Sequence, residues 1–177
     1  MDLQTLKSSV CKGSTCKEGC YTLEESDRSA TLKKIVICDL PQEALIIKMD
    51  KIRFNNFFRD QWGFNKHSDF LIVTDDKLVF IEMKSKTEVC QELEKDCQKK
   101  FLSDECTINY ADTIFQKMLS KNAFFNNRET HYVLFYQSPS VAKTSTAIGV
   151  EEPNISPNSF RKIPVSNEGT ISFNKTI

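Results

Sequence analysis

The stretch "KHSDFLIVTDDKLVFIEMKSK", residues 66–86, contains two apolar runs separated by a pair of aspartates. The runs are rich in β-branched and aromatic residues, which favours β-strands, and aspartate is a common turn residue. If Asp75 and Asp76 form the loop, Val73 pairs with Leu78 and every further residue keeps that register. The sequence therefore predicts a β-hairpin that is apolar on both faces, as in a strand pair buried inside a sheet.

Charged residues lie at the inner ends of this hairpin. The register sets Asp69 opposite Glu82, with β-carbons roughly 5 Å apart. Lys84 is two residues beyond Glu82 and therefore points to the same face. His67 would face Lys84 if the pairing continues. A strand that is apolar on both faces needs a reason to end in charges, so we expect a functional site here. The alternative is an ordinary charged ladder on the surface.

Two facing carboxylates repel each other unless a proton or a cation lies between them. Mg²⁺ is a hard cation that prefers oxygen ligands. A bound metal of this kind can activate water and stabilise charge on a phosphate under attack, and Lys84 adds a compact positive charge. Asp69, Glu82 and Lys84 are therefore candidates for metal-assisted phosphate chemistry.

Further strands and helices are predicted around this hairpin. Apolar runs at 35–38 and 45–49 flank "DLPQE" and predict a second hairpin, with a helix opening at Pro41 as the alternative. Apolar residues recur every four positions over 88–101, and a clear amphipathic pattern covers 107–122. Both patterns are typical of helices, so two helices are expected after the hairpin.

Residues 131–137, "HYVLFYQ", have a continuous apolar centre and predict a strand buried on both faces. The order of elements predicts an α/β fold in which a mixed β-sheet is flanked by helices. We expect residues 1–30 to be a polar lead-in and 31–140 to form the core. Residues 141–177 contain several prolines and should form an extended C-terminal segment packed on that core.

The segments "SDFLIV" and "FIEMKSK" together resemble the signature of the PD-(D/E)XK nuclease superfamily. Ser68-Asp69 stands for the first half, with serine in place of the signature proline, and Glu82-Met83-Lys84 for the second. The resemblance implies a restriction-endonuclease-like αβββαβ core over 34–137. It implies a Mg²⁺ ion, for which Mn²⁺ can substitute, held by Asp69, Glu82 and the backbone carbonyl of Met83. Lys84 would position or activate the attacking water.

Members of this superfamily often add an acid from a preceding helix and a glutamine from the following helix. Candidates for these auxiliary roles are Glu24, Glu25 and Glu43, and Gln91, Gln98 and Gln116, with Glu43 and Gln98 carried forward. His67 could hold a phosphate or assist Lys84, and the alternative is a polar residue that merely starts a strand. A basic helix face could contact a nucleic-acid backbone through Lys86, Lys95, Lys99 and Lys100, or could simply be solvated.

The resemblance implies a Mg²⁺-dependent nuclease that acts on DNA rather than RNA, similar to small bacterial enzymes of restriction or anti-phage defence. The alternative function is a catalytically silent, nuclease-like subunit that binds or regulates a larger complex. The chain has 24 basic and 24 acidic residues, so its formal net charge is zero. That balance excludes a general nucleic-acid coat protein and suggests that affinity comes from a homodimer or a partner protein.

No apolar run approaches the roughly 20 residues of a membrane helix, and the first residues lack the apolar centre of a signal peptide. We therefore expect a cytoplasmic protein with no membrane partner. Three of the seven cysteines, Cys11, Cys16 and Cys20, lie close together and could bind zinc with Cys38. A metal-binding interaction protein built on these residues is a third hypothesis, and reduced thiols are the alternative.

Overall fold

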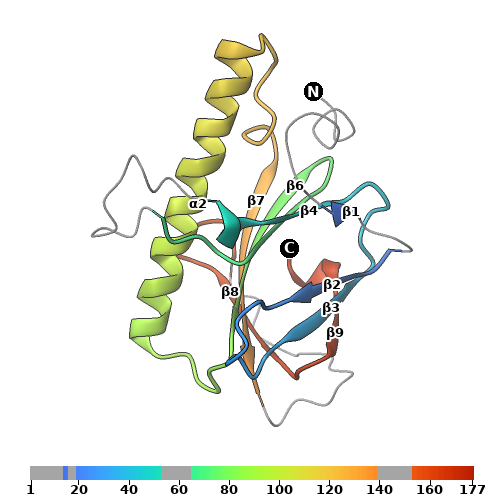
Figure 1. Cartoon of the computed structure of the whole chain (residues 1–177), viewed down its shortest axis with the longest axis vertical. Helices are drawn as coiled ribbons and strands as arrows, with labels where there is room; N and C mark the ends of the chain where they lie inside the picture. The colour runs from blue at the N-terminus through green and yellow to red at the C-terminus, as the bar shows by residue number, and fades with distance from the viewer. Residues whose placement is uncertain (1–13, 16–18, 53–64, 139–152) are drawn as a thin grey trace.

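The structure is a computed structural model that describes residues 14–15, 19–52, 65–138 and 153–177. These residues form two mixed β-sheets and one α-helix (Figure 1). These two sheets and the helix confirm the expected mixed α/β fold, whereas the restriction-endonuclease-like core stays a prediction. Within the described ranges, no helix has both the length and the apolar character needed to cross a membrane.

The larger sheet contains, in spatial order, β1 (Ser14–Thr15), β4 (Leu45–Lys48), β5 (Phe70–Val73), β6 (Lys77–Lys84), β7 (Glu129–Gln137) and β8 (Arg161–Val165). The smaller sheet contains β2 (Tyr21–Glu24), β3 (Lys34–Cys38) and β9 (Gly169–Ser172). The helices are α2 (Gln91–Met118) and the short 3-10 helices η1 (Met49–Lys51) and η3 (Phe173–Lys175). Strand β5 is antiparallel to both of its neighbours, β4 and β6, and β7 runs parallel to both β6 and β8.

The central hairpin of β5 and β6 has the predicted register. Val73 pairs with Leu78, and the Thr74 N–H donates to the Lys77 carbonyl at 2.9 Å, which leaves Asp75 and Asp76 as the loop. The Thr74 hydroxyl donates to the Asp76 carboxylate at 2.9 Å and accepts the Lys77 N–H at 3.0 Å. The turn therefore fixes the register through side-chain as well as backbone bonds.

Alternate residues of this hairpin enter two different cores, which explains why both of its faces are apolar. Leu71, Val73, Leu78 and Phe80 pack in one cluster with residues of α2. Phe70, Ile72, Val79 and Ile81 pack in the other cluster with residues of the smaller sheet. Figure 1 shows the resulting layers, with α2 along one side of the larger sheet and β2, β3 and β9 on the other.

The predicted hairpin between 35–38 and 45–49 is wrong, although both segments are strands. β3 pairs with β2 and β9, whereas β4 pairs with β1 and β5. Asp39 has a positive φ of 59°, and the chain leaves one sheet here to enter the other. Apolar composition identifies a strand but carries no information about its partner, so the short connection suggested a pairing that does not form.

The expectation of two helices is also wrong, because α2 is continuous from Gln91 to Met118. The polar "SDE" at 103–105, which suggested a break, lies inside the helix. Asp104 is fully buried there because it accepts hydrogen bonds from the chain just before β5. The polar residue therefore makes a tertiary contact and does not end the helix.

Asp112 organises the turn between α2 and β7. Its buried carboxylate accepts the backbone N–H groups of Phe124, Phe125 and Asn126, at distances of 2.7–3.0 Å. Arg128 packs its guanidinium 3.9 Å from the centre of the Phe124 ring. Buried N–H groups need an acceptor, so one side chain fixes the turn that leads into β7.

Replacing Asp112 with alanine should lower the free energy of unfolding by about 2–4 kcal/mol, because several backbone N–H groups lose their only side-chain acceptor. The neighbouring Thr113→Ala is the control, since Thr113 bonds only to Asn109 within the same helix, and it should change stability by less than about 0.5 kcal/mol. Urea denaturation of both variants measures the difference. Equal midpoints for the two variants would contradict this role of Asp112.

Candidate active site

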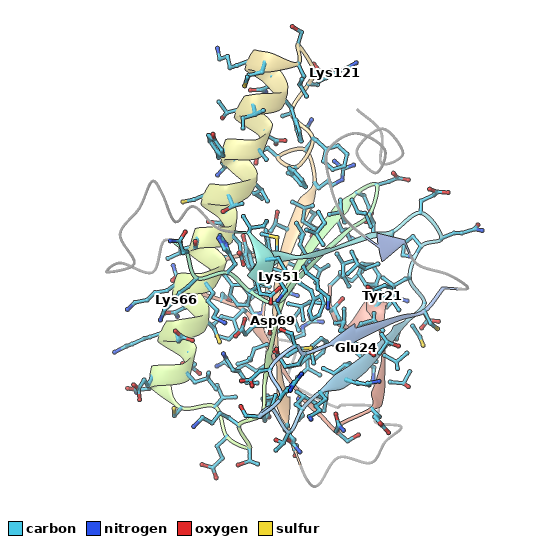
Figure 2. All side chains as sticks on the ribbon, in the orientation of Figure 1. Tyr21, Glu24, Lys51, Lys66, Asp69 and Lys121 are labelled. Atoms are coloured by element: carbon cyan, nitrogen blue, oxygen red, sulfur yellow. The ribbon has the colours of Figure 1, made fainter. Side chains whose placement is uncertain are left out.

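The register of the central hairpin brings Asp69 and Glu82 together, as the sequence predicts. Asp69 precedes β5, and its N–H donates to the Ile81 carbonyl at 3.0 Å, which extends the ladder to the pair opposite Glu82. The Asp69 carboxylate accepts the Met83 N–H at 2.6 Å. Both contacts hold Asp69 against β6, and Figure 2 shows it near the centre of the molecule.

The Glu82 carboxylate is fully buried and interacts with two lysines. Its Oε1 atom lies 2.6 Å from Lys84 Nζ and 2.5 Å from Lys100 Nζ. Its Oε2 atom is also buried but makes no hydrogen bond to any described residue. A buried carboxylate requires opposite charge and hydrogen bonds. One carboxylate oxygen therefore has two ammonium partners, whereas the other, which is also buried, has no hydrogen-bond partner among the described residues.

The predicted position of Lys100 on an outward helix face is wrong. Lys100 was grouped with the outward lysines of the helix, but its ammonium points inward to Glu82, and only 15% of its side chain is exposed. Its position on the helix indicates this inward direction, because Lys100 lies among Cys97, Phe101 and Asp104, which are all buried on α2. Lys86, Lys95 and Lys99 are exposed, as a nucleic-acid contact would need.

Asp96 lies at the rim of this site, one helical turn before Lys100. Its carboxylate is 4.0 Å from Lys84 Nζ and 3.4 Å from Lys66 Nζ. About a third of its side chain, 35%, is exposed. Contacts between such partly exposed charges are weak, so Asp96 can exchange one ammonium for another at little cost in free energy.

The electrostatics of the site follow from burial and from the closeness of like charges. Burial, and then the charge of Glu82, raise the pKa of Asp69 well above its ordinary value, although Lys100 and the Met83 N–H act in the opposite direction. Burial alone would lower the pKa of Lys100, but the carboxylates of Glu82 and Asp69 outweigh it, so that pKa is raised. Lys100 is therefore a permanent cation at neutral pH.

The acids at the end of β2 are close to Asp69. Glu24, Glu25 and Asp69 line one small cavity together with Lys48 and Asp50, and the charge of Glu25 contributes to the raised pKa of Asp69. Figure 2 shows Glu24 on the strand that approaches Asp69. The cavity therefore places these two glutamates, which the sequence offered as candidates, beside Asp69, while Glu24 also pairs with Lys34 at 3.1 Å.

The other auxiliary candidates lie elsewhere. Glu43 is exposed in the turn before β4. Gln98 lines a different cavity, which it shares with Glu94, Phe160 and Lys162. The auxiliary roles of Glu43 and Gln98 therefore stay predictions.

His67 has a buried partner on α2, and its position opposite Lys84 stays a prediction. Its Nδ1 atom lies 2.8 Å from Asp104 Oδ1, and both side chains are fully buried. The backbone N–H of Ser68 donates to the other Asp104 oxygen at 3.1 Å. Burial raises the pKa of Asp104, and these hydrogen bonds oppose that rise. The cluster ties α2 to the start of β5 and so positions Asp69.

The same cluster gives the backbone N–H of Ser68 a structural role. Proline has no backbone N–H, so a proline at this position could not donate to Asp104. Serine keeps the donor and therefore keeps the link between the strand and α2. Sequence reasoning missed Asp104 because nothing in its local pattern shows that its partner is 36 residues earlier.

The described side chains of this site supply only part of the ligand set of a divalent metal. The part of the chain that is described contains no group of three or more His, Cys, Asp or Glu side chains arranged for a metal ion. Mg²⁺ is commonly bound by one or two carboxylates, with waters and substrate phosphate completing its shell. The register brings two carboxylates, those of Asp69 and Glu82, to this site; a metal held by them, with Met83 as a carbonyl ligand, stays a prediction.

The zinc hypothesis can be followed for two of its four cysteines. Cys20 and Cys38 lie on neighbouring strands with their sulfur atoms 2.8 Å apart. Cys11 and Cys16 are outside the described residues.

No protein-family model, curated protein or solved structure matches this chain significantly, so the functional proposal rests on the geometry of the molecule.

Asp69→Asn should stabilise the metal-free protein at neutral pH, because it removes a carboxyl whose charged form is disfavoured by burial and by Glu82. The pKa of Asp69 is raised in the folded state, so the folded chain binds the extra proton and wild-type stability falls as the pH rises from 4 toward that pKa. The gain in melting temperature of Asp69→Asn should therefore grow between pH 4 and pH 8.

Thermal melts in EDTA across this pH range measure the effect. Asp75→Asn is the matched control, since Asp75 is an exposed aspartate in the loop of the same hairpin, and its difference from wild type should stay small. A difference for Asp69→Asn that is flat with pH, or negative at pH 8, would show that the Asp69 carboxylate is not held at an electrostatic disadvantage.

Proposed function

We propose that this protein is a metal-dependent nuclease that hydrolyses phosphodiester bonds in DNA, with Mg²⁺ as its cofactor. The observation that carries the proposal is the buried Glu82 carboxylate. One of its oxygens contacts Lys84 and Lys100, and the other has no hydrogen-bond partner among the described residues. Asp69 lies opposite on the neighbouring strand. Two carboxylates and a lysine at the end of a hairpin are what metal-assisted phosphate chemistry requires.

Each residue has a definite task in this proposal. Asp69 and Glu82 would hold the metal through their carboxylates. When bound, the metal supplies Lewis-acid polarisation of the phosphate and lowers the pKa of a bound water. Lys84 holds the Glu82 carboxylate in place at 2.6 Å and keeps a positive charge beside the attacking water. The side chain of Lys84 is 26% exposed, so its ammonium can meet a substrate at the surface.

The exposed lysines beside the site favour a nucleic-acid substrate, and DNA is the one that we propose. Lys66, Lys95 and Lys99 are exposed, and Lys66 shares Asp96 with Lys84. Ammonium groups at the surface of α2 suit a phosphate backbone. The neutral net charge of the chain limits this attraction, so we also propose that a homodimer or a partner protein extends the contact, as in a defence system.

A catalytically silent binding subunit is the second candidate function. One observation favours it: Glu82 already has two ammonium partners, so its charge is satisfied without metal. A protein with this site could bind nucleic acid through its lysines and leave the phosphodiester bonds intact. The cleavage assay below separates the two candidates.

Purified full-length protein should cut DNA in Mg²⁺ or Mn²⁺ and not in EDTA. Glu82→Gln and Lys84→Met should each lower the rate by about 100-fold or more, because each removes a group that acts on the metal or the water. Supercoiled plasmid, single-stranded DNA and single-stranded RNA, compared by gel electrophoresis, identify the substrate.

The ion pair at the opposite end of the same strands supplies matched controls. Lys77 and Glu129 lie 2.9 Å apart on β6 and β7, far from Asp69 in the register. Lys77→Met and Glu129→Gln should cut at the wild-type rate. Wild-type protein that binds DNA without cutting it in either metal would reject the nuclease and favour the silent subunit.

A further inference from the structure

We propose that Lys100 is the internal counter-ion of this site, and that a divalent metal binds Asp69 and Glu82 only by displacing its ammonium. The inference rests on the proposed function for the identity of the metal site. It adds a residue from α2 and a step that precedes catalysis. The expected chemistry is the exchange of one cation for another at a buried carboxylate.

The contact between Lys100 and Glu82 carries the proposal. Lys100 Nζ lies 2.5 Å from the same Glu82 oxygen that Lys84 contacts at 2.6 Å. Glu82 is completely buried and only 15% of the Lys100 side chain is exposed, so bulk water screens this pair weakly. A metal bound to the open Oε2 atom would therefore lie within a few ångströms of the Lys100 charge. Like charges at such a distance repel strongly in a poorly solvated site.

Charge balance points to the same conclusion. Metal binding needs both carboxyls ionised, and the two negative charges of Asp69 and Glu82 are then already balanced by the ammonium groups of Lys84 and Lys100. The ionised cluster is therefore neutral without a further ion. Adding a divalent cation while both ammonium groups stay would leave two excess positive charges in a largely buried site.

Lys100 is the cation that can leave. Lys84 is fixed to β6, only two residues from Glu82, and the proposed function needs it there. Lys100 reaches the site from a different layer on a long, flexible side chain. Asp96 lies four residues earlier on the same helix, which is the spacing at which side chains pair across one turn. Its partly exposed carboxylate can accept the displaced ammonium.

Metal affinity tests the proposal directly. Lys100→Met removes the charge and keeps most of the aliphatic chain, so it should bind Mn²⁺ at least about tenfold more tightly than wild type, because the competing cation is gone. Lys99→Met is the matched control, since Lys99 is the adjacent, exposed lysine of the same helix. It should bind Mn²⁺ as wild type does. Calorimetric titration of metal-free, full-length protein gives the affinities.

Two further experiments test whether the gain in affinity depends on Glu82 and whether Mn²⁺ displaces Lys100 in wild-type protein. Adding Glu82→Gln to Lys100→Met should abolish the gain in affinity. In wild-type protein, the Lys100 amine should react faster with an acetylating reagent when Mn²⁺ is present, while Lys99 should react at the same rate with and without metal. Mass spectrometry of the labelled peptides measures both rates, and it applies even if Lys100→Met does not fold.

A folded Lys100→Met variant with wild-type or weaker Mn²⁺ affinity overturns the proposal, as does Lys100 labelling that Mn²⁺ leaves unchanged. The proposed function is judged separately by wild-type cleavage. Metal-dependent cutting together with an unchanged affinity in Lys100→Met would reject the counter-ion alone. Absence of cutting and of Mn²⁺ binding in every variant would reject both.

Discussion

The burial of one carboxylate, that of Glu82, is the constraint on which the rest of the site depends. A charged group in the interior must be matched by opposite charge, and here the matching cations come from two layers, Lys84 from β6 and Lys100 from α2. The larger sheet, the helix above it and the turn that sets the hairpin register must all be in place before these three groups can meet. The electrostatic requirement thus links the site to the fold.

The environment of Asp69 completes this picture. Its carboxylate is held on β6 by the Met83 N–H, and its backbone is aligned by the His67–Asp104 cluster that ties α2 to the start of β5. The structure therefore keeps two acids close together although their charges repel. Carboxyls with strongly perturbed pKa values cluster at functional sites, which is why we propose chemistry at this pair.

Local sequence was sufficient to predict the hairpin, its register and the meeting of Asp69 with Glu82, because a two-residue turn and a period of two fix which residues oppose each other. It was not sufficient for Lys100 and Asp104, since each meets a partner in another layer of the fold. The failed pairing of 35–38 with 45–49 has the same cause: strand character is local, but the choice of partner depends on the whole chain. The polar residues at 103–105 suggested a break between two helices. They lie inside one continuous helix because Asp104 makes a buried contact.

The most direct measurement is a diffraction experiment on crystals of the wild-type protein grown with Mn²⁺, with data collected to locate the metal by its anomalous scattering. The account predicts one strong peak within coordination distance of both the Asp69 and Glu82 carboxylates, with the Lys100 ammonium moved from Glu82 toward Asp96. Crystals that show no peak at saturating Mn²⁺, with Lys100 still on Glu82, would contradict the central claim that this cluster is a metal-dependent catalytic site.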